Sequence, residues 1–209
     1  MGLPVPVPDN DSTNNDSTKE KLIYDFGIKD KNTFYVRRPA MTALIAAYTP
    51  DRVIGNNGHI PWNIEGEQKR FKELTTGNIV IMGRKTFDEI KKKLGGPLPD
   101  RITVLVSTTT AEKEIDGRLY IAGSFEKAMD KCRMIMSGHG ADKTIFIAGG
   151  AALYRRAVDI VDVMYITEVD ARIRGDVFFP EFDEALFDKE IEEYHQGKIP
   201  YTYVKYTRK

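Results

Sequence analysis

The chain has 209 residues, 41% of them hydrophobic, and its 31 basic residues balance 31 acidic ones, so the formal net charge is zero. This length predicts one domain with a sizeable core and room for an appendage, and the balanced charge gives no general attraction to nucleic acid or to anionic membranes. Since the sequence also has no apolar run of membrane-spanning length and no secretory-signal pattern, we expect a soluble, cytoplasmic monomer whose partner is a small molecule.

The first 40 residues differ in composition from the rest. The segment LPVPVP at 3–8 favours an extended, polyproline-like backbone, and residues 9–18 form a polar run. We expect both segments to be mobile, because they carry too few apolar side chains to offset the entropy of ordering. Two apolar runs follow at 22–28 and 33–38, which either form a small hairpin on the main body or belong to a leader or fusion segment. The main domain is expected to span 41–209.

From residue 41 onward, strand-like and helix-like segments alternate. Continuous apolar runs predict strands buried on both faces at 43–48, 78–82, 102–107, 118–122, 144–148 and 163–169. Between them we expect short helices that begin near Glu65, follow Thr86 as far as Ile90, run from an N-cap at Ser124 to Met136, and contain Tyr154. Gly and Pro mark 91–101 as a loop, and 189–196 with 201–208 alternate like a closing hairpin. This order predicts an α/β fold with a mostly parallel sheet.

One carboxylate stands in an unusual place. A glycine-rich loop at 54–62 carries the only tryptophan, Trp62, and leads into a helix on which Glu67 shares a face with Phe71 and Leu74. The solvated face instead carries Lys69. A helix carboxylate is more often simply exposed, but an acid aligned with apolar neighbours indicates the chemical centre.

Three strand-to-helix junctions carry glycine where a helix begins, at Gly55, Gly83 and Gly149-Gly150. Helix N-termini offer unpaired N–H groups and partial positive charge, which suit phosphate oxygens. The second junction adds two cations and a hydroxyl in Arg84, Lys85 and Thr86, and the next strand ends in two more hydroxyls, Ser107 and Thr108. Together these could hold an adenosine 2′-phosphate, which favours NADP over NAD. The alternative is that the glycines only pack helices and the cations are solvated, since no GxGxxG motif is present.

The ordered motifs ALIAA, VIGNNGHIPW, an acid five residues after the tryptophan, VIMGRKTF, LPDR, IAGG with a tyrosine four residues on, and TEVDA followed by GDVFFP resemble dihydrofolate reductase. The resemblance covers 41–209. It implies an enzyme that reduces 7,8-dihydrofolate to tetrahydrofolate with NADPH, passing hydride to C6 and a proton to N5, and that antifolates inhibit. It also implies an eight-stranded, mostly parallel twisted sheet with an antiparallel C-terminal strand and about four flanking helices.

At the substrate, the resemblance makes Glu67 the active-site carboxylate. It would hydrogen-bond the pterin N3 and 2-amino group in a fork, supported by Thr167, and would favour N5 protonation through water rather than by direct transfer. Burial among apolar groups should raise its pKa. Arg101 would pair with the α-carboxylate of the substrate's glutamate. The remaining substrate contacts implied by the family are Ala46, Ala47, Gln68, Phe71, Leu98 and Ala148.

At the cofactor, the resemblance places Tyr154 beside the nicotinamide, where it would help to stabilise developing positive charge. The nicotinamide would also be flanked by Ala46, Ala47, Ile54 and Gly55. The adenosine end would be surrounded by Gly83, Arg84, Lys85, Thr86, Ser107 and Thr108, and the pyrophosphate approached by a cis-linked Gly149-Gly150 with Ala151, Ala152 and Leu153. Trp62 would close the loop over the site and hold a structural water, and Asp176 would hydrogen-bond the closed loop as a gating residue.

The sequence departs from the family pattern at three positions. Glu67 stands where most bacterial members have Asp, Gln68 where an apolar residue is usual, and Ala148 where a bulkier aliphatic is common. The Gly-Glu-Gln triplet also resembles members that tolerate trimethoprim. These departures predict weakened binding of diaminopyrimidine antifolates.

Two other kinds of protein are weighed against this interpretation. One is the riboflavin-pathway reductase of the same fold, which lacks the PW-plus-acid arrangement, and the other is a pterin- or nucleotide-binding or interaction protein without turnover, against which Glu67, Trp62 and Tyr154 argue. The single Cys132 is expected to be a buried structural thiol of a protein in a reducing compartment. The three histidines, His59, His139 and His195, show no metal-ligand spacing and are expected to be structural or solvated.

Overall fold

The computed structural model describes residues 26–30, 33–36, 40–64, 66–139 and 142–209. The chain divides into two units, Met1–Pro39 and Ala40–Lys209. In the first unit, β1 (Phe26–Asp30) and β2 (Thr33–Val36) pair antiparallel as a hairpin, with Phe26 opposite Val36. The segments 3–8 and 9–18, for which we expect mobility, lie outside the described part of the chain.

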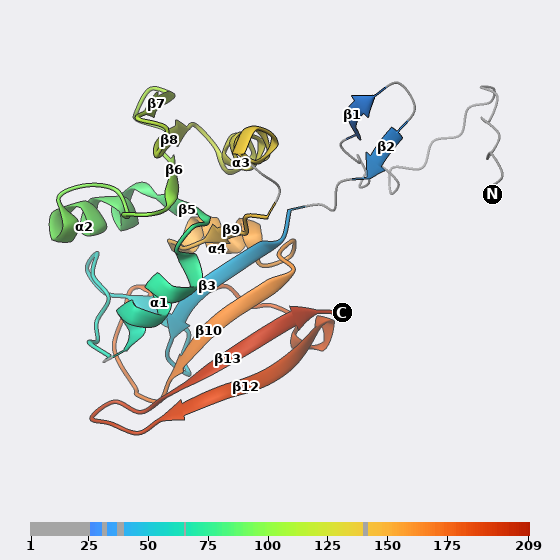
Figure 1. Cartoon of the computed structure of the whole chain (residues 1–209). Helices are drawn as coiled ribbons and strands as arrows, with labels where there is room; N and C mark the ends of the chain where they lie inside the picture. Colours follow the sequence, from blue (N-terminus) through green and yellow to red (C-terminus); the bar gives the residue numbers. More distant parts are fainter. Residues whose placement is uncertain (1–25, 31–32, 37–39, 65, 140–141) are drawn as a thin grey trace, which may run out of the picture. The chain divides into compact units, whose positions relative to one another are not determined.

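The second unit is organised around one large sheet (Figure 1). The strand order is β12-β13-β10-β3-β9-β5-β6-β8-β7. The strands are β3 (Thr42–Tyr48), β5 (Ile79–Gly83), β6 (Ile102–Val106), β7 (Lys113–Ile115), β8 (Leu119–Ala122), β9 (Ile145–Ile147), β10 (Val163–Val169), β12 (Phe187–His195) and β13 (Tyr201–Arg208). A separate small ladder joins β4 (Val53–Gly55) to β11 (Val177–Phe178).

The sheet is parallel from β10 through β8, and antiparallel only at its two margins. β13 pairs antiparallel with both β10 and β12, and β7 pairs antiparallel with β8. The expectation of a mostly parallel α/β sheet with an antiparallel C-terminal strand is confirmed. The short, exposed β7 makes a ninth strand, which the sequence analysis did not predict because its three residues carry no apolar run.

The helices cover both faces of this sheet. Residues of α3 (Phe125–His139) and α4 (Ala151–Ala157) pack in one apolar cluster with alternate strand residues such as Leu44 and Ile81. Residues of α1 (Glu67–Thr75) and α2 (Arg84–Leu94) pack in the other, against Ile45 and Val80. Adjacent strand residues therefore point into different clusters, as the pleat requires, and the continuous apolar runs follow from burial on both faces. Cys132 is fully buried in the first cluster, and burial raises the pKa of its thiol to about 12, so the expected structural thiol is confirmed.

Two helices are longer than predicted. α2 continues through the lysine run to Leu94 and ends at Gly95, which adopts a left-handed φ of 77°, because lysine is a good helix former and glycine fits that position. α3 continues three residues beyond the predicted end at Met136. Its N-cap is confirmed, since the Ser124 hydroxyl accepts a hydrogen bond from the Lys127 N–H at 3.2 Å.

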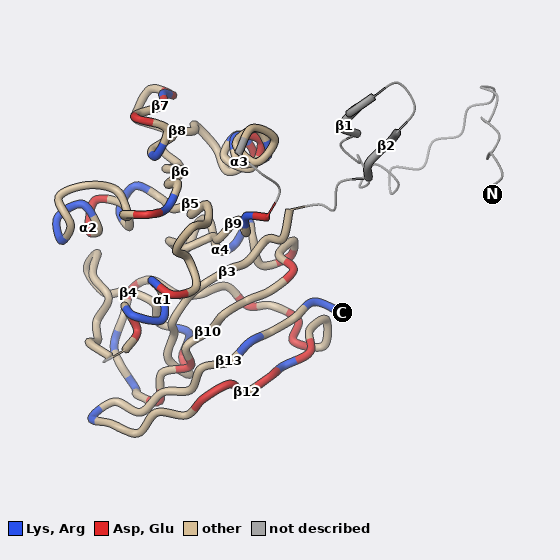
Figure 2. Tube along the Cα trace, in the orientation of Figure 1, with Lys and Arg blue, Asp and Glu red and all other residues tan. Residues whose placement is uncertain are grey.

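The margin of the sheet formed by β12 and β13 is charged, with acidic residues along β12 and basic residues on β13 (Figure 2). β12 is rich in acidic side chains and is the last strand on its side. Its pairing with β13 slips between Ile191, opposite Val204, and Glu193, opposite Tyr203. Glu192 is therefore the extra residue of a β-bulge. No helix within the described residues is long and apolar enough to cross a membrane.

Candidate active site

The predicted site residues gather where the parallel strands end. β5 ends at Gly83, β6 is followed by Ser107, and β9 is followed within two residues by Gly149. The carboxyl ends of neighbouring parallel strands lie along one edge of a sheet, which is where ligands bind in open α/β folds. The topology therefore brings together junctions that lie far apart in the sequence.

Glu67 is the first residue of α1 and lies over the sheet. Its helix starts after Gly66, which has φ 91° and provides no side-chain cap. The Thr167 hydroxyl on β10 donates a hydrogen bond to Glu67 Oε1 at 3.1 Å, whereas Glu67 Oε2 is buried and has no partner among the described residues. Burial raises the pKa of the Glu67 carboxyl, and the Thr167 hydroxyl and the Arg70 charge oppose that rise. A buried acceptor without a donor is costly, so Oε2 is available to a ligand that supplies one.

The apolar residues predicted at the substrate fall into two neighbouring clusters. Phe71, Leu98 and Ala148 pack in the cluster under α1 and α2. Trp62 and Ala47 pack in a smaller cluster with Ile64, Tyr201 and Tyr203. Ala46, buried next to Ala47 on β3, points to the opposite face of the sheet, into the cluster that Ile54 borders. The structure thus places both clusters on the face of the sheet where Thr167 holds Glu67, and Ala46 on the opposite face.

Arg101 is held at the end of α1 that lies away from Glu67. Its Nε donates to the Pro99 carbonyl at 2.7 Å and its Nη1 to the Thr75 hydroxyl at 3.3 Å. The side chain is largely buried, and this desolvation lowers its pKa from the usual arginine value. The two hydrogen bonds fix the plane of the guanidinium, which is the arrangement needed to bind a carboxylate through two parallel hydrogen bonds.

Two of the glycine junctions touch. The Gly83 N–H donates to the Gly149 carbonyl at 2.7 Å, and the Gly149-Gly150 peptide is cis, as the resemblance implies. Gly149 has φ 110°, and a Cβ there would lie 3.1 Å from the Tyr154 hydroxyl and 3.5 Å from the Thr86 hydroxyl. The Tyr154 hydroxyl in turn donates to the Ile45 carbonyl at 2.9 Å. Only glycine fits here without strain, so the two strand ends approach closely enough for their backbone to face one ligand.

Arg84 extends from this junction to the end of β6. Its guanidinium hydrogen-bonds the Thr110 hydroxyl and the Asp88 carboxylate, the latter at 3.1 Å, and Thr110 also accepts from the Ser107 hydroxyl at 3.1 Å. Arg84, Ser107 and Thr110 therefore form a cluster of donors that suits an anion. Lys85 and Thr108 are exposed beside it. Of the predicted pyrophosphate residues, Leu153 is buried near Gly83, Ala151 is half-buried and Ala152 is exposed.

The loop between β4 and α1 is tied at two points. The Asn57 N–H donates to both carboxylate oxygens of Asp176, at 3.1 and 3.2 Å, and the Asp176 N–H donates to the Gly55 carbonyl at 3.1 Å. Nearer the tip, His59 Nδ1 lies 2.8 Å from Glu89 Oε1 on α2. Residues 57–60 are otherwise exposed, so these contacts hold this part of the loop between Asp176 and α2.

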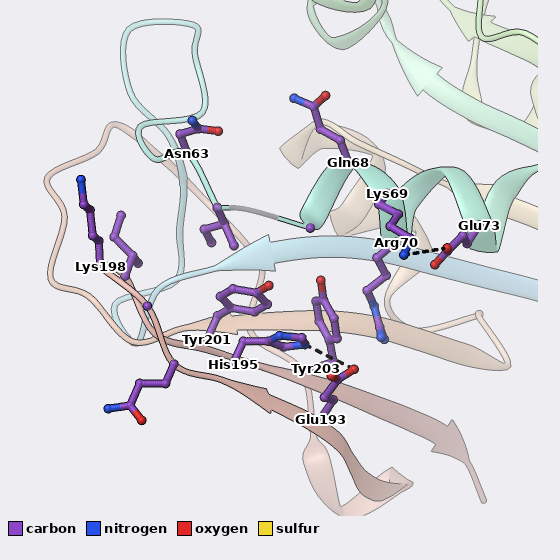
Figure 3. A pocket seen from close by; sticks show the side chains of 15 residues that line it. Asn63, Gln68, Lys69, Arg70, Glu73, Glu193, His195, Lys198, Tyr201 and Tyr203 are labelled. Atoms are coloured by element: carbon purple, nitrogen blue, oxygen red, sulfur yellow. Dashed lines mark ion pairs between the residues drawn. The ribbon is translucent and has the colours of Figure 1, made fainter.

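The far side of α1 faces a cavity of about 1130 Å³ (Figure 3). Arg70 crosses its inner wall, with its guanidinium carbon 3.8 Å from the centre of the Tyr203 ring and an ion pair to Glu192. His195 stacks on Tyr201 at 4.5 Å between ring centres. The cavity is further lined by Asn63, Gln68, Lys69, Glu73, Glu193, Lys198 and Ile199.

Sequence reasoning missed several residues that surround the predicted ones. Thr110 links Arg84 to Ser107, and its signal was only a fourth hydroxyl in the Ser-Thr-Thr-Thr run at 107–110. Tyr203 lies opposite Thr167 in the β10–β13 register, which no local pattern reveals. Among the described residues, no group of three or more His, Cys, Asp or Glu is arranged to hold a metal.

Comparison with known proteins agrees with the family resemblance seen in the sequence. The family model described as dihydrofolate reductase matches residues 41–208. A dihydrofolate reductase type A13 from Escherichia coli is 37% identical over 166 residues, covering 79% of this chain and 93% of its own length. Dihydrofolate reductase HdrB from Haloferax volcanii is 36% identical over 166 residues (79% and 82%), and dihydrofolate reductase from Staphylococcus aureus is 34% identical over 173 residues (80% and 98%).

Proposed function

The chain belongs to the dihydrofolate reductase family, and from that premise we propose that it reduces 7,8-dihydrofolate to tetrahydrofolate with NADPH, using Glu67 to hold the pterin. The observation that carries the assignment of Glu67 is its geometry, with one carboxylate oxygen held by Thr167 and the other buried without a partner. A pterin supplies two N–H donors on one edge, and a carboxylate fixed in this way accepts both. The family match and the relatives do not favour the riboflavin-pathway alternative.

Glu67 would act in two ways on the bound substrate. Its fork of hydrogen bonds fixes the orientation of the ring, which places the reacting carbon toward the glycine junctions. Because burial raises its pKa, the carboxyl exchanges protons closer to neutral pH than an exposed glutamate does, which favours protonation of the ring nitrogen. We propose that this proton reaches N5 through water. Thr167 keeps the carboxyl in one orientation throughout.

The chain's own residues fit the cofactor that the family implies. NADPH supplies the hydride when bound. Gly83, Gly149 and Gly150 leave the backbone open at the point where the strand ends touch, and Arg84, Ser107 and Thr110 offer donors at the adjacent edge. We assign the first group to the pyrophosphate and the second to the adenosine phosphate, with Lys85, Thr86 and Thr108 beside it. Tyr154, held by the Ile45 carbonyl, would lie at the nicotinamide end with Ala46, Ala47, Ile54 and Gly55.

The remaining roles are also proposals of this kind. Phe71 and Leu98 would contact the substrate beyond its pterin, Ala148 would lie near the pterin, and Arg101 would bind the terminal carboxylate. Trp62 would close the loop over the site, and Asp176 would hold that loop closed through Asn57.

A direct test removes the carboxylate. Turnover is followed by the loss of NADPH absorbance with dihydrofolate, in wild type and Glu67→Ala. We expect turnover at neutral pH to fall by about 10²–10⁴-fold, the usual contribution of a positioned acid or base. Glu73→Ala is the matched control, because Glu73 lies on the same helix and, within the described part of the chain, forms an ion pair only with Lys69, at 3.8 Å. Undiminished turnover in Glu67→Ala would contradict the assignment.

We propose in addition that trimethoprim binds weakly. Gln68 is exposed at the first turn of α1 and Ala148 is half-buried in the cluster beside it, so the pocket is more polar and wider than in the usual pattern. Replacing Gln68 with Leu should lower the trimethoprim inhibition constant by up to about tenfold, the value of one apolar side chain that the bound inhibitor covers. An inhibition constant of the wild type already in the range of sensitive bacterial members would rule this out.

We also propose that 41–209 is the catalytic domain and 1–40 an appended segment. The family match begins at residue 41, and the chain divides between Pro39 and Ala40. A chain that begins at Met41 should keep the turnover and melting temperature of the full chain. A clear fall in either would assign the first 40 residues a part in the domain.

A further inference from the structure

Arg70 is a buried cation one turn along α1 from Glu67. Only 15% of its side chain is exposed, against 79% for its neighbour Lys69. Residues three apart on a helix lie on adjacent positions of its surface. The same helix that presents the active-site carboxylate therefore also carries a fixed positive charge on the side away from the substrate wall.

Two contacts hold the Arg70 guanidinium in place. It stacks on Tyr203, with 3.8 Å between the guanidinium carbon and the ring centre, and it forms an ion pair with Glu192. Glu192 can reach it because this residue is the extra one of the β12 bulge, and bulges redirect a side chain in this way. Tyr203 is directly opposite Thr167 in the β10–β13 pairing, so the stack is built on the strand next to the one that supports Glu67.

The groups that face Glu67 come from every neighbouring element. β10 contributes Thr167, which donates to the carboxylate. β13 contributes Tyr203 and α4 contributes Tyr154, both of them phenols whose pKa is raised by burial and by the nearby Glu67 charge. Tyr201 and His195 lie behind Tyr203. Arg70 is the only cation that acts on the Glu67 pKa among the described residues, and its effect is to lower it.

We propose that Arg70 is a positioning residue for the reaction. Held by Tyr203 and by Glu192 in the bulge, it keeps the Glu67 carboxylate ionised, so that this carboxylate can bind the pterin. This inference rests on the proposed role of Glu67. Two opposing influences act on that carboxyl. Burial favours its neutral form, while Thr167 and Arg70 favour the charged form. Because Glu192 neutralises part of the Arg70 charge, the ion pair determines how strongly Arg70 lowers the Glu67 pKa.

The Arg70–Glu192 ion pair makes the proposal testable, because replacing one member should raise the Glu67 pKa and replacing the other should lower it. Arg70→Met removes the cation and leaves Glu192 uncompensated, so the Glu67 pKa should rise by about one unit, the lower end of the range for a nearby charge. Glu192→Gln leaves Arg70 uncompensated, so the Glu67 pKa should fall by a smaller amount. A purely structural role of the pair would not produce shifts of opposite sign.

The measurement is the titration of the Glu67 carboxyl carbon by NMR in full-length protein with ¹³C-labelled glutamate, with the signal assigned by its absence in Glu67→Gln. Arg70→Lys should restore most of the wild-type pKa, and Lys69→Met is the control for a cation that is exposed on the same helix. The pH profile of kcat/KM for dihydrofolate should shift in step with the titration. If Arg70→Met does not fold, Glu192→Gln and Arg70→Lys still decide the sign.

The outcomes separate the two proposals. If Arg70→Met and Glu192→Gln leave the Glu67 pKa unchanged, or move it in the same direction, the inference about Arg70 is wrong, although Glu67 can still be essential. If Glu67→Gln keeps full turnover, the proposed function of Glu67 is wrong whatever its pKa does.

Discussion

The proposed substrate side and cofactor side of this site differ in how far their charged groups are buried and held within the chain. On the substrate side, Glu67 is buried, held by Thr167 and backed by Arg70, Tyr203 and Glu192. On the cofactor side, Gly83 and Gly149 hydrogen-bond each other and carry no side chain, and Arg84 and Lys85 are exposed. The comparison teaches that one side is organised before a ligand arrives, whereas the other offers donors and charge that a phosphate would complete.

The largest effect should come from filling the glycine junction. In Gly149→Ala a Cβ would sit 3.1 Å from the Tyr154 hydroxyl at a φ of 110°. Backbone strain and a disturbed Tyr154–Ile45 hydrogen bond together should lower the free energy of unfolding by about 2–4 kcal/mol, and NADPH affinity should fall at least about tenfold. Thermal unfolding and fluorescence titration measure the two.

Gly58→Ala is the matched control for that variant. Gly58 also has a positive φ, of 82°, but nothing lies within 4 Å of a Cβ there. Its loss should be about 1 kcal/mol, from the left-handed conformation alone. Equal losses in both variants would mean that close approach to Tyr154 plays no part.

The next effect tests the exposed donors of the cofactor side. Arg84→Ala should reduce kcat/KM for NADPH by about 10–100-fold, the value of one or two charge-assisted hydrogen bonds to phosphate, and should leave NADH within about twofold. Its ion pair with Asp88 is exposed, so stability should barely change. Steady-state kinetics with both cofactors at two salt concentrations provide the test. A parallel loss for NADH would instead place Arg84 away from the 2′-phosphate.

A smaller effect is expected on the substrate side, where a substitution of Glu67 should raise rather than lower the free energy of unfolding. Burial raises the pKa of Glu67 in the folded chain, so the folded state binds its proton more tightly than the unfolded state does. This stabilisation is present at pH values below the ordinary glutamate pKa and is lost as pH rises through the folded pKa. At neutral pH the charged carboxyl therefore opposes folding.

Glu67→Gln should accordingly raise the unfolding free energy at pH 7 by about 1–2 kcal/mol, the cost of an unsatisfied buried acceptor, while it abolishes most turnover. The gain should disappear as the pH falls below about 4.3, the ordinary glutamate pKa. Melting temperatures across this range measure it. A variant that is less stable than wild type at pH 7 would show that the site does not strain the fold.

The smallest effect should come from the loop that joins the two sides. His59→Gln removes an exposed contact to Glu89, and exposed pairs contribute less than about 1 kcal/mol. We expect kcat to change by less than about threefold, with unchanged stability. A double-mutant cycle with Glu89→Gln isolates the pair, and a coupling near zero would mean that the Asp176 contacts alone hold the loop.

The sequence predicted the substrate side and the cofactor side unequally. The face shared by Glu67, Phe71 and Leu74 follows from helical spacing, and the glycine junctions follow from strand ends, so both could be read locally. The Arg70–Tyr203–Glu192 contact could not, because it depends on the β10–β13 register and on a bulge that shifts β12 by one residue. The end of α2 was predicted too early, since a lysine run before Gly-Gly reads as loop although lysine favours helix.

The bulge in β12 has one more consequence. β12 is the last strand on its side of the sheet, and an edge strand offers unpaired backbone groups to which another chain can add. The extra residue interrupts the regular ladder, and the neighbouring Asp188, Glu190 and Glu193 carry like charge. A second copy of β12 would meet both an interrupted hydrogen-bond ladder and repulsion between like charges. The bulge that places Glu192 against Arg70 therefore also opposes edge-to-edge aggregation of the sheet.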